Sequence, residues 1–188
     1  MGIPPLSRAV FLDRDGVLNQ VVMRGGKPHP PASVADLEIV AGAAAALDRL
    51  KARGLPLIVV TNQPDVARGA QTMETVQAIH ERIRRELPID EVLTCPHDDC
   101  AGCSCRKPKP GLILEGAKQY GIDPHRSFMI GDRWLDIDAG RSAGCRTVWI
   151  DRGYRERGPS LAPDARVDSL SDAVTWILQQ IDSEKDGT

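Results

Sequence analysis

No stretch of this 188-residue sequence approaches the ~20 consecutive apolar residues that a membrane-spanning helix requires. The first residues, MGIPPLSRAVFLDRDG, also lack the charged segment and apolar run of an export signal. We therefore expect a soluble, cytoplasmic protein with no membrane partner. We also expect it to be a monomer.

An excess of basic residues is missing too. Lysine and arginine number 24 against 26 aspartate and glutamate residues, which gives a net charge of -2 and a pI near 6.1. Aromatic residues make up only 4% of the sequence and do not interleave with the basic residues Arg106, Lys107 and Lys109, as stacking platforms for bases would. We therefore expect no nucleic-acid partner, and an anionic ligand would need a local basic site.

Internal repeats and low-complexity tracts are absent, and the chain is long enough for one domain whose core needs no disulfide bonds. Short, β-branched apolar runs alternate with helix-like patterns. The expected strands are 9–12, 57–60, 92–93, 127–130 and 147–150. The expected helices are 42–53, 73–87, 112–120 and 172–181.

This alternation is typical of a Rossmann-like three-layer α/β sandwich with a central parallel sheet. We expect it to form a single domain over residues 1–188. The polar segments 27–32 and 155–168 are expected to be surface loops, and 183–188 a disordered tail.

Acidic, hydroxyl and amide side chains follow the first two expected strands. FLDRDGVLN places Asp13 and Asp15 after the first strand, and LPLIVVTNQ ends the second in Thr61, Asn62 and Gln63. A solvated turn and an N-cap would explain each motif on its own. Parallel strands, however, bring their carboxyl ends to one edge of a sheet, where open α/β folds bind ligands. The two motifs together therefore favour an anion site.

Two further motifs are expected at the same edge. CRKPKPG supplies Arg106, Lys107 and Lys109 before a helix, and SFMIGDRWLDIDAG places Asp132 and Asp136 after a strand. Three basic residues are often only a solvated surface. At this edge, however, a lysine would neutralise a phosphoryl group, and clustered carboxylates would require a divalent cation such as Mg²⁺ between them.

In this order, D-R-D-G-V-L-N, T-N-Q, R-K-P and G-D-x-x-x-D resemble the four signature motifs of the haloacid dehalogenase (HAD) superfamily, over about residues 10–151. The resemblance implies a magnesium-dependent phosphomonoester hydrolase. It implies that Asp13 is the nucleophile, forming an aspartyl-phosphate, and that Asp15 is the general acid and then the base. Thr61 and Lys107 would hold the phosphoryl oxygens.

The same resemblance implies a magnesium site formed by Asp13, the backbone carbonyl of Asp15, and Asp132. Asp136 would bind a metal-bound water or pair with Lys107. Four further side chains are expected to contact the substrate, namely Asn62, Gln63, Arg106 and Arg133.

The interval between the first two motifs is largely used by one helix and one strand, so we expect no large cap domain and an open site. An uncapped chain with C-P-H and C-x-C-R-K-P resembles the HAD branch of heptose bisphosphate and histidinol-phosphate phosphatases. The resemblance implies D-glycero-D-manno-heptose 1,7-bisphosphate, cleaved at the 7-phosphate, as the substrate. Cations available for its second phosphate are Arg24, Lys27, Arg106 and Arg133. Histidinol phosphate or another small phosphorylated metabolite is the alternative.

Four of the five cysteines and one histidine are concentrated in CPHDDCAGCSCRKPKPG. In a reducing compartment such a cluster favours a metal site or a catalytic thiol over disulfide bonds. Three cysteines and a histidine are a common closed ligand set for zinc. Resemblance to the HAD branch named above implies a structural Zn²⁺ in the loop 95–105, bound by Cys95, His97, Cys103 and Cys105.

The remaining cysteines and histidines have plainer interpretations. Cys100 is expected to be an exposed thiol, with its replacement of His97 as a zinc ligand left open. Cys145 is expected in the core. No role is expected for His29, His80 and His125. A non-enzymatic alternative also stays open, in which the chain is a zinc-stabilised binding module.

Overall fold

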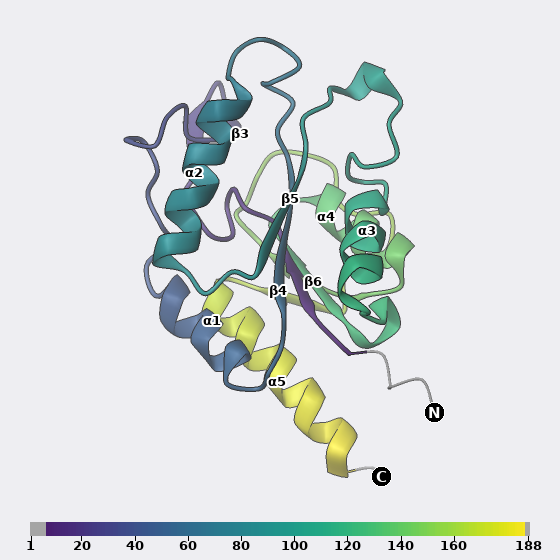
Figure 1. Ribbon diagram of the computed structural model, residues 1–188. Coiled ribbons are helices and arrows are strands. Elements are labelled where there is room, and N and C mark those ends of the chain that lie inside the picture. Colours follow the sequence, from purple (N-terminus) through teal and green to yellow (C-terminus); the bar gives the residue numbers. More distant parts are fainter. Residues whose placement is uncertain (1–6, 187–188) are drawn as a thin grey trace.

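The computed structural model describes residues 7–186 and is built around a six-stranded sheet in the order β5-β4-β1-β6-β7-β8 (Figure 1). Every neighbouring pair of strands is parallel. The strands are β1 (Val10–Leu12), β4 (Leu57–Asn62), β5 (Glu91–Cys95), β6 (Phe128–Gly131), β7 (Arg146–Ile150) and β8 (Ala165–Val167). All six carboxyl ends therefore share one edge of the sheet.

Helices cover both faces of this sheet (Figure 1). One layer contains α1 (Ala43–Lys51), α2 (Met73–Glu86) and α5 (Leu170–Asp186), and the other contains α3 (Gly111–Tyr120) and α4 (Trp134–Ala143). Side chains alternate along β1, since Val10 and Leu12 pack toward the first layer and Phe11 toward the second. The expected three-layer α/β sandwich is confirmed. Within residues 7–186, no helix is both long and apolar enough to cross a bilayer.

Between β1 and α1 the chain forms a small antiparallel hairpin, β2 (Val22–Arg24) with β3 (Lys27–His29), and no cap domain. The loop expected over 27–32 is thus partly a strand. Its turn consists of Gly25 and Gly26, both at positive φ (56° and 77°), which a two-residue hairpin turn accepts readily. This hairpin lies beside the site described below.

Two other expectations at the C-terminal end are wrong. The segment 155–168 contains β8, which extends the sheet by pairing with β7. Its sequence, ARV, has a charged, exposed residue at the centre and therefore forms no apolar run. Helix α5 continues to Asp186, so the expected tail is helical over 183–186, and 187–188 lie outside the described residues. Cross-element ion pairs of Glu184 with Arg8 and Arg146 hold this last part of the helix.

Candidate active site

The four motifs meet at the carboxyl edge of the sheet. Asp13 directly follows β1, Asn62 ends β4, Asp132 directly follows β6, and Lys107 lies just before α3. A cavity of about 450 Å³ opens there, and the four side chains line it together with Asp136. Residues far apart in the sequence are thus brought to one point, as the expected parallel sheet requires.

Lys107 lies among the carboxylates and is only 3% exposed. Its Nζ donates to Asp13 Oδ1 at 2.6 Å and to the Val60 carbonyl oxygen at 2.8 Å, and it lies 2.6 Å from Asp136 Oδ1. Burial alone would lower the pKa of Lys107, but Asp13 and Asp136 raise it above its usual range. The ammonium group therefore stays charged and compensates the acids around it.

Asp13, Asp132 and Asp136 are buried and present carboxylate oxygens within 4.8 Å of one another. Burial raises the pKa of Asp13 to about 7 although Lys107 opposes the shift, and burial with repulsion from Asp13 and Asp136 raises the pKa of Asp132 well above its usual value. Three carboxylates around one ammonium leave an excess of negative charge.

The surroundings of Asp132 fit a cation at this point. Its Oδ2 accepts a hydrogen bond from the Tyr154 hydroxyl at 2.9 Å, whereas its Oδ1 is buried with no hydrogen-bond partner among the described residues. A buried carboxylate oxygen without a partner is costly unless a cation binds it. Oxygen ligands of this kind suit a hard divalent ion.

Two glycines permit the close packing of the acids. Gly16 has φ +87°, and a Cβ there would lie 1.7 Å from Asp132 Oδ2. A Cβ at Gly131 would lie 2.0 Å from the Asp136 Cβ. Both positions need glycine because any larger residue would occupy the space of a site carboxylate.

Asp15 is held by three neighbouring side chains. Arg14 donates to both carboxylate oxygens from Nη2 (2.9 and 2.8 Å) and to Oδ1 from Nε (3.1 Å). Asn19 Nδ2 donates to Oδ1 at 3.0 Å, and Gln63 Nε2 donates to Oδ2 at 2.8 Å. Burial would raise the pKa of Asp15, but the charge of Arg14 and these hydrogen bonds lower it on balance. The carboxyl group is therefore ionised and fixed in orientation.

The polar residues that end β4 make hydrogen bonds that hold other residues of the site in place. Gln63, expected to contact the substrate, is fully buried, does not line the cavity, and donates to Thr61 Oγ1 at 2.9 Å as well as to Asp15. Thr61 is 1% exposed. Asn62 does line the cavity, and its amide exchanges two 3.1 Å hydrogen bonds with the backbone of Lys107. The second motif therefore orients the first and the third.

Basic side chains line the rim of the cavity, but three of its arginines are paired with acids, Arg68 with Asp98 and two others as follows. Arg106 Nε donates to Asp99 Oδ1 at 2.7 Å, and Arg133 donates to both carboxylate oxygens of Glu156, the shortest contact being 2.6 Å. Lys27 of the hairpin also lines the cavity. The sequence contained no local signal for Glu156 or Tyr154, which lie in a segment expected to be a surface loop.

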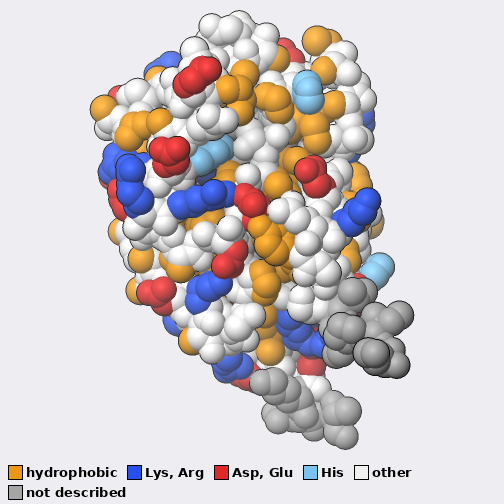
Figure 2. All heavy atoms as spheres, in the orientation of Figure 1, with side chains coloured by type: hydrophobic (Ala, Val, Ile, Leu, Met, Phe, Trp, Pro, Cys, Tyr) orange, Lys and Arg blue, Asp and Glu red, His pale blue; other side chains and the backbone are white. Residues whose placement is uncertain are grey.

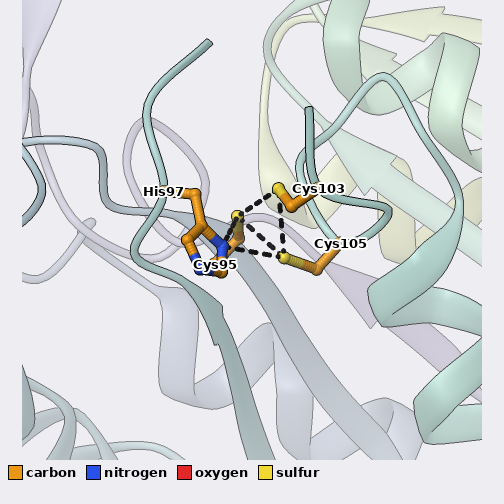
Figure 3. Close-up of side chains that lie close together, drawn as sticks. All are labelled: Cys95, His97, Cys103 and Cys105. Atoms are coloured by element: carbon orange, nitrogen blue, oxygen red, sulfur yellow. Dashed lines mark hydrogen bonds between the residues drawn. The ribbon is translucent and has the colours of Figure 1, made fainter. Parts of the chain in front are cut away.

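Figure 3 shows that Cys95, His97, Cys103 and Cys105 point toward one another. The Cys95 and Cys105 sulfur atoms are 3.0 Å apart, and His97 Nδ1 is 3.3 Å from Cys105 Sγ. The four ligand atoms lie within 4.8 Å of one another, so one metal ion can contact them all. All five cysteines are free. Cys100 is exposed and outside this cluster, and Cys145 is buried, as expected.

His80, for which the sequence predicts no role, is only 8% exposed. Its Nε2 lies 3.0 Å from Arg14 Nη1. Sequence reasoning missed both residues, because D-R-D-G is typical of a solvated turn and the contact joins the loop after β1 to α2, across 66 positions. Only the packing of α2 against the first motif reveals the pair.

The site and fold have clear counterparts among known proteins. A family model described as HAD-hydrolase-like matches residues 104–173, which include Lys107, Asp132 and Asp136. One curated phosphatase is 35% identical over 195 residues, covering 92% of this chain and 96% of its own length. The chain therefore belongs to the HAD-like hydrolases and is a phosphoric monoester hydrolase, which rules out the binding-module alternative. That relative is the D-glycero-D-manno-heptose-1,7-bisphosphate 7-phosphatase of Thermosynechococcus vestitus.

Two further comparisons agree. The D-glycero-beta-D-manno-heptose-1,7-bisphosphate 7-phosphatase of Pasteurella multocida is 36% identical, covering 79% of this chain and 84% of its own length. The crystal structure of a D,D-heptose 1,7-bisphosphate phosphatase from B. bronchiseptica, complexed with magnesium and phosphate, matches with a TM-score of 0.81 and 28% identity. The match covers 92% of this chain and 99% of that chain.

Proposed function

We propose that this protein is a magnesium-dependent D-glycero-D-manno-heptose-1,7-bisphosphate 7-phosphatase that acts through an aspartyl-phosphate. The observation that supports the chemistry is the contact between Asp13 and the buried ammonium group of Lys107 in the cavity, beside Asp132 and Asp136. The names of the relatives support the substrate.

In the first step an Asp13 carboxylate oxygen attacks phosphorus, and the bond from phosphorus to the sugar oxygen breaks while Asp15 delivers a proton to that oxygen. In the second step water attacks the aspartyl-phosphate, Asp15 accepts its proton, and inorganic phosphate leaves with Asp13 restored. Lys107 holds the phosphoryl oxygens in both steps, whereas Thr61, which does not line the cavity, supports the site through Gln63. Mg²⁺ bound by Asp13, Asp132 and the Asp15 carbonyl, with Asp136 through water, would supply the remaining charge neutralisation.

The environment of Asp15 suits this division of roles. Its lowered pKa favours the ionised form, which the second step uses as a base. An incoming phosphate brings negative charge close to this carboxyl group and raises its pKa, which favours the proton that the first step requires.

The substrate is tested with a panel of phosphorylated metabolites in the presence of Mg²⁺. We expect the highest kcat/KM for one anomer of the heptose 1,7-bisphosphate, because Lys27, Arg106 and Arg133 line the cavity and present positive charge to a second phosphate. Fructose 1,6-bisphosphate controls for two phosphates on another sugar. A clear preference for histidinol phosphate would overturn the substrate assignment while leaving the chemistry intact.

We further propose that Cys95, His97, Cys103 and Cys105 hold a structural Zn²⁺. The four ligand atoms lie within 4.8 Å of one another, and three cysteines with one histidine are a common closed ligand set for zinc. The metal would order the loop that positions Arg106, whose Nη1 donates to the His97 carbonyl oxygen at 3.2 Å.

Metal analysis of protein purified under reducing conditions should find about one zinc per chain. We expect the Cys103→Ser variant to lose most of its zinc, since three ligands bind the ion less tightly than four. Cys100→Ser is the matched control and should retain it, because Cys100 lies outside the cluster. Full zinc content in Cys103→Ser would refute this ligand set.

We also propose that the protein works as a cytoplasmic monomer. Five free cysteines suit a reducing compartment. Among the described residues the large exposed hydrophobic side chains are Met23 on β2, Leu114 and Tyr120 on α3, and Leu161 in the loop before β8. On the face in view in Figure 2, acidic and basic side chains are interspersed, so that face offers no broad basic surface to a nucleic acid.

A further inference from the structure

The buried pair of Arg14 and His80 is not explained by the phosphatase chemistry described so far. Arg14 is fully buried, which is rare for a charged side chain, and it is the largest side chain that the described core contains. Its guanidinium group contacts two different residues, because Nε and Nη2 face Asp15 while Nη1 faces His80. His80 therefore lies directly behind the group that holds the Asp15 carboxylate.

The chemistry of this contact defines the state of His80. A guanidinium group can only donate hydrogen bonds, so Nε2 of His80 must accept and the ring must carry its proton on Nδ1. Burial and the positive charge of Arg14 lower the pKa of His80 to about 3, although Asp15 opposes the shift. The ring is thus a neutral, rigid acceptor that satisfies the one Arg14 nitrogen not directed at Asp15.

We propose that His80 is a positioning residue for proton transfer, which acts through Arg14 to hold the Asp15 carboxylate in a fixed orientation. This inference rests on the proposed function, because it assumes that Asp15 exchanges a proton with the leaving oxygen. His80 touches neither the cavity nor the reacting atoms and acts only through its neighbour.

The geometry shows why this support matters. Both oxygens of Asp15 accept from Arg14, so a rotation of the guanidinium group turns the carboxylate with it. Without an acceptor at the His80 position, Nη1 would be a buried donor without a partner, and the guanidinium group would shift to find one. A misplaced acid weakens protonation of the leaving oxygen, whereas Asp13 and Lys107 keep their positions.

The leaving group provides a readout that a general structural effect would not produce. An alkyl alcohol leaves only with protonation, whereas p-nitrophenolate leaves readily without it. For each substrate, kcat/KM reports the step in which the leaving group departs. We therefore compare kcat/KM for the heptose bisphosphate with kcat/KM for p-nitrophenyl phosphate, and take the ratio of the two values as the readout. A defect in proton transfer lowers the first value more than the second.

Two variants at position 80 differ by one methylene group. The amide oxygen of His80→Gln reaches the place of Nε2, whereas that of His80→Asn reaches only the place of Nδ1. We expect His80→Asn to lower kcat/KM for the alkyl substrate on the order of 10-fold, a part of the ~10²–10⁴-fold that general acids contribute, and to change the p-nitrophenyl value by less than about 2-fold. His80→Gln should restore the wild-type ratio.

Ile79→Val, a change in packing on the same turn of α2, is the control and should leave the ratio unchanged. Equal loss for both substrates in His80→Asn, or no loss in either, would overturn the proposal. If His80→Asn does not fold, His80→Leu replaces it in the same comparison. Failure of the proposed function gives a different result. If the aspartyl-phosphate chemistry were wrong, the Asp13→Asn variant would release phosphate at the wild-type rate, whatever the His80 variants do.

Discussion

Phosphate release by the Asp13→Asn variant should fall on the order of 10⁴-fold or more, since losses of this size follow removal of a catalytic nucleophile. The amide has nearly the shape of the carboxylate but its oxygen is a poor nucleophile toward phosphorus. Wild-type enzyme quenched in acid during turnover should contain labelled phosphate bound to the protein, and the variant should contain none. Both measurements use the full chain with Mg²⁺.

Stability should not account for this loss. The substitution removes one negative charge from three buried carboxylates that surround a single ammonium group, so the free energy of unfolding in magnesium-free buffer should stay equal or rise. Asp48→Asn makes the same chemical change on the exposed surface of α1 and should leave phosphate release unchanged. Equal release by wild type and Asp13→Asn would refute the aspartyl-phosphate mechanism.

Replacement of Lys107 by methionine should have the second largest effect. The ammonium group contacts Asp13 and Asp136 at 2.6 Å, and its loss leaves both carboxylates buried without compensation. Breaking a buried pair in this way costs about 3–5 kcal/mol of unfolding free energy. Activity should fall by about 10²–10³-fold as well, because a preorganised donor to the phosphoryl group is lost. Chemical denaturation in magnesium-free buffer and phosphate release with Mg²⁺ measure the two effects.

The loss of unfolding free energy caused by Lys107→Met should shrink as the pH is lowered from about 8 to about 5. The pKa of Asp13 is raised in the folded protein to about 7, so the folded state binds a proton that the unfolded state has already released. Folding is therefore favoured at low pH and loses this contribution as the pH rises toward 7. Without Lys107 the pKa of Asp13 rises further, so the dependence becomes steeper at neutral pH.

The matched control for Lys107→Met is Lys51→Met. Lys51 pairs with Asp90 at 2.7 Å, but both side chains are 35% exposed. Exposed pairs of this kind contribute less than about 1 kcal/mol, so the control should be nearly as stable as the wild type and fully active. An equally small effect of Lys107→Met would contradict the role assigned to the buried ammonium group.

Most of the central sheet was predictable because its apolar strands are local signals in the sequence. Apolar β-branched runs followed by polar motifs indicated β1, β4 and β6 and placed Asp13, Thr61 and Asp132 at their ends. The helices that carry apolar stripes were found for the same reason. β8 and the β2–β3 hairpin were not, since their sequences ARV, VMR and KPH contain charged and exposed residues and form no apolar run, unlike the fully buried VFL of β1.

The sequence by itself determined the kind of chemistry, because carboxylates, a lysine and hydroxyl or amide groups after parallel strands must meet at one edge of the sheet. Only the tertiary structure decided which of these groups face the cavity and which support it. Gln63 and His80 support Asp15, and Tyr154 binds Asp132, through contacts between elements distant in the chain. The spacing of side chains along the sequence gives information only about near neighbours in the chain. The contacts named here depend on how helices and loops pack over the sheet, and this packing is a property of the whole fold.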